Sequence, residues 1–443
     1  MGAEWKKKII MLLFGLFGAV ILVGCGERQE SQEEEDETQI ITLMAAQNWI
    51  KDMDRQLFRE FQEETGIEVK VLLAPDNGYE TLLGTCLSGG NESIDIFMAV
   101  AGSWAVSAEL PDVALDLSDE PWVSNLEDWA RKANSVDGKV IGFSTWSIDY
   151  EGILYNRTLF EEYGLEVPQT WDDFIKLCEQ LHHLGVTPLY ESINTVWHSK
   201  SWIYGLTPAL YQEDPDFLKK LNEGKGYQLG DMKAFRKGLK QLQELFGTRD
   251  GSVPRYYMTD GLEDDFSGSY DALIHRQAAM MFTYSAYAKE LKERGSEDEW
   301  GMFPVPLLDN QMAVSNGGGV SKYINRHSSH QEECKAFFRF LSRKENLETY
   351  YAARADLVTA TFQGVEQVHP VEATEEILER SKGQPPVMFL NDIKYFPPDI
   401  YLYIQGLADG EYTVDQMVEY CDSYRGKMLE GETKDTDKEE NGK

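Results

Sequence analysis

The sequence predicts an α/β protein in which mainly parallel strands alternate with helices. Ile40–Met44 is a short apolar run, Met53–Phe61 repeats its apolar residues every four positions, and Ile67–Val71 alternates as a half-buried strand. This β-α-β order favours parallel strands joined by a crossover helix. The chain has 443 residues, of which 42% are hydrophobic, enough for two ordinary domains or one two-lobed protein.

The first 24 residues have the features of an export signal. Lys6–Lys8 supply a positive start, and Ile9–Val23 is apolar but shorter than a membrane-spanning helix. The segment that ends this signal, Leu22-Val23-Gly24-Cys25, resembles a bacterial lipobox. This resemblance implies that residues 1–24 are removed and that Cys25 carries a lipid anchor. The alternative is a plain secretory signal followed by an incidental cysteine. Residues 25–39, which are acidic and lack large apolar side chains, are expected to be a disordered linker.

Polar and aromatic residues follow the first predicted strands directly. Asn48 and Trp49 come after Ile40–Met44, and Trp104 comes after the apolar run Ile94–Met98. Ligands of open α/β sheets collect at the carboxyl ends of strands. We therefore expect these three side chains at a binding site.

The middle of the chain holds the clearest local signals. Ile153–Tyr155 predicts a buried strand, Asn156 a helix start, and Gly164 the end of that helix. Thr170 and Asp173 have the spacing of a capping box for the next helix. The apolar face of that helix is expected to comprise Phe174, Leu177, Cys178, Leu181 and Leu184.

Later segments of the chain give fewer local signals. Residues 214–247 predict a polar helical stretch with one apolar side, and Glu332–Leu347 an amphipathic helix. Gly317-Gly-Gly319 lacks the lysine of a phosphate-binding loop and is interpreted as a flexible segment. Residues 428–443 are expected to be a charged, disordered tail.

Composition excludes several classes of function. A formal charge of −34 argues against nucleic acid or anionic lipid as a partner, since both require basic surface. No G-x-S-x-G, H-E-x-x-H or Walker motif is present, and His182-His183 lacks ligands at zinc spacing, so we expect neither an enzyme nor a cofactor or metal. Four isolated cysteines are interpreted as buried thiols, with pairing left open: Cys86, Cys178, Cys334 and Cys421.

Aromatic content favours a carbohydrate ligand. The chain has 10 tryptophans and 22 tyrosines, and sugar rings stack their C–H faces on aromatic planes while their hydroxyls bind polar side chains. Trp197, Trp202 and Tyr204 cluster around His198 and Lys200. For each single aromatic residue, core packing is the alternative interpretation, and for Asp149 it is a role in a turn.

The chain carries an ordered set of short motifs. They are Tyr155-Asn156-Arg157, Phe160, Gly164, Pro168-Gln-Thr170-Trp171-Asp172-Asp173, Gly185-Val-Thr-Pro188, His275-Arg-Gln-Ala278-Ala-Met280, Trp300-Gly-Met-Phe-Pro-Val-Pro306 and Gly317-Gly-Gly319. As an ordered set they resemble the family 1 extracellular solute-binding proteins, the maltose-binding-protein-like group that serves sugar ABC importers. The resemblance covers residues 40–425, and a tyrosine-rich segment stands where the family's G-x-W is expected.

The resemblance implies a two-lobed fold with the ligand cleft between the lobes. Residues 40–147 with 320–364 would form one lobe, and residues 148–319 with 365–427 the other, so that the chain crosses three times. By resemblance, Asp149 is a ligand-binding carboxylate. The expected ligand-binding residues are Asn48, Trp49, Trp104, Trp146, Asp149, Trp197, Tyr284, Tyr287, Gly318 and Phe396.

The predicted function is capture of an extracellular mono- or oligosaccharide and its delivery to the membrane subunits of an ABC permease. We expect a monomer that is held on the extracellular face by its lipid anchor. The alternatives are a binder of a peptide or polyamine on the same scaffold, a sensor that has lost transport, and a secreted glycoside hydrolase. The hydrolase would need a pair of carboxyls across a cleft, which nothing in the sequence marks.

Overall fold

A computed structural model gives the fold of the chain. Residues Gln39–Lys443 form one compact unit. The predicted signal, Cys25 and nearly all of the acidic linker lie outside the described residues. The structure describes residues 39–75, 78–88, 92–101, 110–146, 149–192, 195–223, 226–247, 255–258, 266–315, 319–354, 357, 360–365, 371–383, 393, 396–397 and 399–441.

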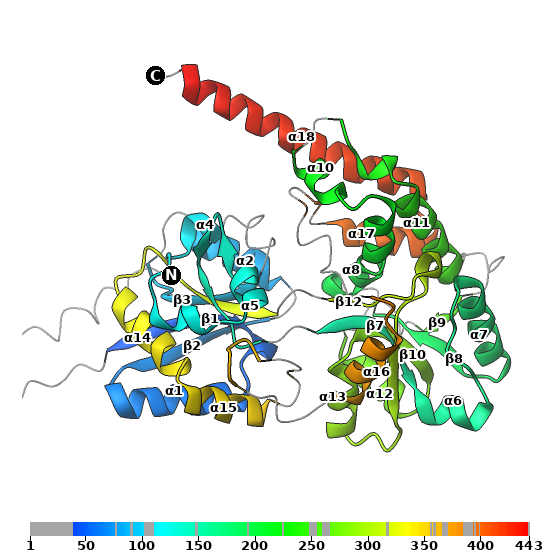
Figure 1. The fold of residues 1–443 in the computed structure, drawn as a ribbon, viewed down its shortest axis with the longest axis horizontal. Helices are drawn as coiled ribbons and strands as arrows, with labels where there is room; N and C mark the ends of the chain where they lie inside the picture. Colours follow the sequence, from blue (N-terminus) through cyan, green and yellow to red (C-terminus); the bar gives the residue numbers. More distant parts are fainter. Residues whose placement is uncertain are drawn as a thin grey trace, which may run out of the picture. The chain divides into compact units, whose positions relative to one another are not determined.

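The first sheet contains the predicted β-α-β unit. Its order is β2-β1-β3-β13-β6, with β1, β2 and β3 parallel and β13 antiparallel to both its neighbours. In Figure 1, β13 belongs to this sheet although the residues between β6 and β13 build another one. The strands are β1 (Ile40–Ala46), β2 (Glu68–Ala74), β3 (Ile96–Val100), β6 (Gly142–Phe143) and β13 (Val320–Ile324), and β4 (Ser135–Val136) pairs separately with β5 (Lys139–Val140).

Helices from two distant parts of the sequence cover this sheet. The apolar face of α1 (Asp52–Thr65) is buried at Leu57 and Phe61, and α1 ends as predicted at Gly66, whose φ is 76°. The rings of Phe61 and Phe337 lie 5.1 Å apart, which joins α1 to α14. The other elements are η1 (Gln47–Trp49), α2 (Tyr79–Leu87), α4 (Leu110–Val113), η2 (Pro121–Asn125), α5 (Asp128–Ala133), α14 (Gln331–Leu341) and α15 (Lys344–Ala353).

The second sheet is built around strand β7. Its order is β11-β7-β10-β8-β9, and β12 also pairs with β7. Strand β7 is antiparallel to β10, β11 and β12, whereas β8 is parallel to β10 and β9. The strands are β7 (Tyr150–Asn156), β8 (Thr187–Tyr190), β9 (Tyr257–Met258), β10 (Ala278–Tyr284), β11 (Trp300–Phe303) and β12 (Val314–Ser315).

The helices around the second sheet include the motif segments. Asn156 caps α6 by accepting the Leu159 N–H at 2.8 Å, and Thr170 caps α7 by accepting the Asp173 N–H at 3.2 Å. The helices are α6 (Arg157–Tyr163), α7 (Trp171–His183), α8 (Val196–Tyr204), α9 (Thr207–Glu213), α10 (Phe217–Glu223), η3 (Leu229–Asp231), α11 (Lys233–Phe246), α12 (Gly268–Ile274), α13 (Tyr287–Glu293), η4 (Leu307–Asp309), α16 (Glu372–Arg380), α17 (Ile400–Asp409) and α18 (Val414–Asn441).

The α/β class is therefore confirmed, and four details differ. Both sheets are mixed, because a single sequence shows which residues form strands but not which direction they pair. Leu184 is 46% exposed because α7 ends before it. The amphipathic run 332–347 is split into α14 and α15. The tail forms the end of α18, whose glutamate, lysine and methionine residues favour helix.

Among the described residues, no helix is long and apolar enough to cross a membrane. Cys178, Cys334 and Cys421 are buried free thiols, as predicted, and Cys86 is a half-buried free thiol.

Replacing Gly152 by alanine should destabilise the second sheet. A Cβ at Gly152 would lie 2.5 Å from the Phe303 carbonyl oxygen and 2.6 Å from Ile377 Cδ1, so β11 and α16 would have to shift. We expect the free energy of unfolding to fall by about 1–3 kcal/mol. The matched control is Gly84→Ala in α2, where nothing lies within 4 Å and helix propensity predicts a gain of about 0.5–1 kcal/mol. Urea unfolding measures both, and equal effects would contradict the close approach at Gly152.

Candidate functional site

Strand pairing brings polar side chains together at one edge of the second sheet. Tyr284, the last residue of β10, is paired with Glu151 near the start of β7, and β8 ends at Tyr190 beside Met281 of β10. The carboxyl ends of β8 and β10 therefore meet the amino end of β7. Asp149 and Glu191, just outside β7 and β8, belong to the same edge.

Asp149 is held by donors of the protein itself. Its Oδ1 accepts the N–H of Tyr150 at 2.8 Å, the N–H of Ser285 at 3.1 Å and the Ser285 hydroxyl. The Ala286 N–H adds a bond at 3.3 Å. The side chain is buried, and burial raises the pKa of Asp149 to about 6 against the opposing effect of these hydrogen bonds. These contacts fasten the turn after β10 to Asp149.

A second group of buried charges lies behind this edge. The Glu191 carboxylate accepts the Trp202 indole N–H at 2.6 Å and lies 2.9 Å from His198 Nδ1. The other ring nitrogen, Nε2, is 2.7 Å from the Phe282 carbonyl oxygen. Because a carbonyl only accepts, Nε2 carries a proton. This network ties α8 to β8 and β10.

The ionisation of this network is shifted by burial and by its neighbours. Burial alone would lower the pKa of His198, but the Glu191 carboxylate and the hydrogen bonds more than offset it, so this pKa is raised. Burial, followed by repulsion from Asp149, raises the pKa of Glu151 to about 8. These neighbours favour the charged form of His198, and a pKa of about 8 means that Glu151 holds its proton at neutral pH.

Sequence reasoning missed Glu151 and Glu191, and did not assign a role to His198. A usable signal existed, because Glu151 interrupts an apolar strand and Glu191 directly follows one. A carboxyl at such a position must be paired or protonated when buried. The pairing of Glu191 with His198 depends on the fold, because His198 lies on a different element, α8.

The first sheet places its predicted residues after β1. Asn48 is exposed and Trp49 is half-buried, both in η1. The Trp49 ring packs edge-on against Tyr79 with centroids 4.9 Å apart, and the Tyr79 hydroxyl donates to the Met98 carbonyl oxygen at 2.6 Å. Trp49 thus lies at the carboxyl ends of β1 and β3, as expected. Trp104 falls outside the described residues.

Trp146 lies where the chain leaves the first sheet. Its ring is half-buried, with the guanidinium carbon of Arg354 5.2 Å from the ring centroid. A Cβ on Gly319 would come within 2.8 Å of Trp146 Cβ, so a glycine is needed for this approach. Trp146 therefore keeps part of its ring accessible beside two segments that connect the sheets.

The remaining predicted residues divide into three groups. The side chain of Tyr287 is fully buried, its ring stacks on Tyr270 at 4.7 Å, and its hydroxyl is 2.5 Å from that of Ser269, so the described contacts of Tyr287 are all within the protein. Tyr284 is half-buried and donates to Glu290 at 2.9 Å, and Phe396 packs partly buried against the core. Trp197 lies in α8 with its side chain outside the described part, and Gly318 lies outside it altogether.

Helix α8 also presents a cation near this region. The Lys200 ammonium lies 5.9 Å from the centroid of the Tyr401 ring, and burial lowers its pKa. Tyr204, one turn further along α8, has a pKa raised by burial and then by Glu151. Lys200 and Tyr204 are thus polar candidates for solute contact that sequence reasoning noted without assigning.

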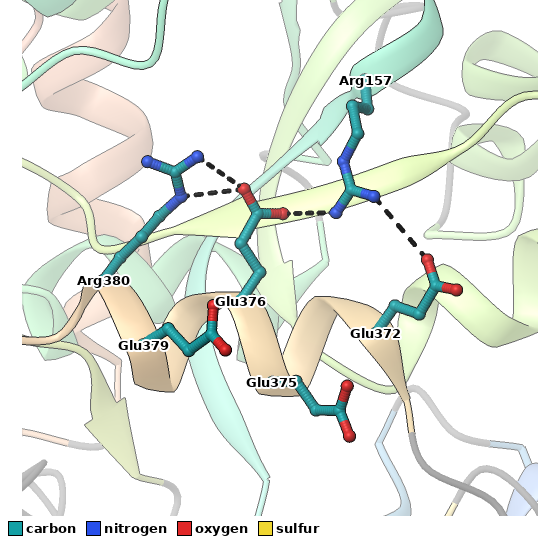
Figure 2. Close-up of a pocket in the computed structure, with 6 residues that line it drawn as sticks. All are labelled: Arg157, Glu372, Glu375, Glu376, Glu379 and Arg380. Carbon is teal, nitrogen blue, oxygen red and sulfur yellow. Dashed lines mark hydrogen bonds and ion pairs between the residues drawn. The ribbon is translucent and has the colours of Figure 1, made fainter.

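A surface depression of about 720 Å³ has a different character (Figure 2). At its centre, Glu376 of α16 accepts from Arg157 at 2.7 Å, from the Tyr155 hydroxyl at 2.8 Å and from the Met302 N–H at 3.1 Å. Arg380 also pairs with Glu376, at 2.7 Å. These contacts fasten α16 to β7 and β11, so the arginine of the Tyr155-Asn156-Arg157 motif has a structural role.

In the part of the chain that the structure describes, no group of three His, Cys, Asp or Glu side chains is arranged to hold a metal ion.

Comparison with known proteins identifies the class to which this fold and site belong. A family model described as bacterial extracellular solute-binding protein matches residues 56–378. The chain belongs to this family of extracellular binding proteins.

Two curated relatives cover most of the chain. The multiple sugar-binding protein of Streptococcus mutans is 24% identical over 364 residues, which is 79% of this chain and 81% of that protein. The melibiose/raffinose/stachyose-binding protein MelE of Bacillus subtilis is 27% identical over 350 residues, with 76% and 78% covered.

Solved structures show the same two-lobed fold. The solute-binding protein RafE in complex with raffinose superposes with a TM-score of 0.70 at 20% identity, covering 88% of this chain and all of that one. A chitin oligosaccharide binding protein gives a TM-score of 0.71 at 19% identity, covering 87% and 98%.

Proposed function

We propose that this protein is the substrate-binding component of an ABC importer and that its solute is a mono- or oligosaccharide. The observation that supports this most strongly is the family match over residues 56–378 together with relatives named for binding sugars. Trp49 and Trp146 are half-buried aromatic residues, and Asn48 is an exposed residue with a side-chain amide. Stacking and hydrogen bonding of this kind suit a sugar ring.

The proposal includes two lobes, residues 40–147 with 320–364 and residues 148–319 with 365–427. The sugar binds between them and stabilises a closed form only by its higher affinity for that form. Export, cleavage before Cys25 and lipidation of Cys25 would hold the monomer at the extracellular face, beside the permease subunits. Mass spectrometry of the membrane-extracted protein tests the anchor.

A saccharide should raise the unfolding temperature of residues 39–443. Ligand present at 100 times its Kd adds about 2.7 kcal/mol to the free energy of unfolding. A thermal-shift screen should cover raffinose, melibiose, stachyose, chitin oligosaccharides, peptides and polyamines. We expect a shift with one saccharide class, lost in Trp146→Ala and Trp49→Ala.

Trp129→Ala is the matched control, because Trp129 of α5 is also a half-buried tryptophan but is not among the predicted ligand-binding residues. It should keep the shift. A shift with polyamines or cationic peptides alone would overturn the sugar proposal.

A further inference from the structure

The chain passes between the two sheets three times. It leaves β6 at Phe143 and enters β7 at Tyr150, and it leaves β12 at Ser315 and enters β13 at Val320. The third passage runs from Phe362, which bridges to Leu126, to α16, which packs on β11. In a two-lobed binding protein these passages are where bending must occur.

At the first sheet the three passages are fastened to one another. The Thr361 hydroxyl donates to the Ser144 carbonyl oxygen at 2.7 Å, which joins the third passage to the first. The Ala101 N–H donates to the Gly319 carbonyl oxygen at 3.1 Å, and Gly319 packs on Trp146. Bending cannot separate these segments on this side without breaking buried contacts.

At the second sheet, a short series of hydrogen bonds fastens the first passage to the third. The Ser285 hydroxyl has one proton and donates it to the Asp149 carboxylate, which only accepts when ionised. The Thr374 hydroxyl lies 2.7 Å from Ser285 Oγ and must therefore be the donor of that bond. The order Thr374, Ser285, Asp149 thus links the start of α16 to the residue that precedes β7.

We propose that Thr374, Ser285 and Asp149 form a latch that makes the first and third passages bend as one hinge. Thr374 lies three residues after the third passage reaches Val371, and Asp149 lies one residue before β7. Ser285 belongs to the turn after β10, a fixed strand of the sheet, so the latch anchors both passages to the same rigid element. The consequence for solute binding rests on the proposed function, but the latch itself does not.

Hydrogen–deuterium exchange of residues 39–443 without ligand tests the latch. In Thr374→Val we expect exchange to quicken by about tenfold both in residues 371–375 and in residues 149–151, because local opening sets the exchange rate of hydrogen-bonded amides. Thr374→Ser keeps the hydroxyl and should restore the slow rates. Thr349→Val is the matched control, since the Thr349 hydroxyl bonds only the Glu345 carbonyl oxygen of its own helix in the described contacts.

Faster exchange confined to residues 371–375 would overturn the latch, because Asp149 would then be held independently of α16. Ser285→Ala provides a second test, and it should speed exchange in both segments as well.

Calorimetry with raffinose as the probe tests the consequence for binding. Thr374→Val should bind raffinose about threefold to tenfold more weakly than the wild type, because a looser hinge lowers the population of molecules that are able to close around the solute. Unchanged affinity with coupled exchange would overturn the functional consequence of the latch. Absence of raffinose binding in the wild type would count against raffinose as the solute and leave the exchange result decisive for the latch.

Discussion

Replacing Glu191 by alanine is expected to lower the free energy of unfolding by about 3–5 kcal/mol, because it breaks a buried charge pair from one side. His198 would keep its Nε2 proton on the Phe282 carbonyl but lose the carboxylate 2.9 Å from Nδ1. The Trp202 indole N–H would lose its acceptor. Urea denaturation followed by tryptophan fluorescence measures the change.

Two variants make this prediction specific. Glu191→Gln keeps an acceptor for Trp202 but not the negative charge, so it should cost less than Glu191→Ala. Glu166→Ala removes an exposed carboxylate between α6 and α7, and such surface changes stay within about 0.5 kcal/mol. A Glu191→Ala protein as stable as Glu166→Ala would show that the buried network does not hold α8.

The second large effect is the pH dependence introduced by Glu151. Its pKa is about 8 in the folded protein because of burial and Asp149, and an unfolded glutamate titrates near pH 4.3, so the folded state binds the proton more tightly. The resulting stability is fully present below the unfolded pKa and is lost as pH rises through 8. The free energy of unfolding should fall by up to about 1.4 kcal/mol per pH unit in this window.

Glu151→Gln removes this titration, because its neutral amide resembles the protonated carboxyl. Its unfolding free energy should exceed that of the wild type at pH 8 and approach it at pH 5. Asp149, with a pKa of about 6, and His198, with a raised pKa, act in the same direction and leave a residual slope. Parallel pH profiles for wild type and variant between pH 5 and 8 would contradict the buried, protonated state of Glu151.

Local chemistry explains which elements the sequence could predict. The Asn156 and Thr170 caps, the αL glycines Gly66 and Gly164, and the apolar face of α7 all depend on residues close together in the sequence. Such signals require no knowledge of the fold. The direction in which β7 pairs with β10 depends on the whole chain path, and no local pattern encodes it.

The site was predicted less completely, for a related reason. Burial decides what an aromatic ring or a carboxylate does, and of two tyrosines three residues apart, Tyr287 is fully buried whereas Tyr284 is half-buried. Asp149 directly precedes β7, and its partners Ser285 and Ala286 come from a turn more than a hundred residues later, which no local pattern indicates. His198 and Glu191 likewise acquire their pairing only when α8 packs against β8.

Calorimetric titration of residues 39–443 with raffinose, stachyose, melibiose and chitin oligosaccharides tests the central claim most directly. We expect saturable binding of one saccharide class at one site per chain, weakened in Trp146→Ala and retained in Trp129→Ala. Binding of a polyamine or peptide with no saccharide binding, or hydrolysis of a glycoside during the titration, would contradict it.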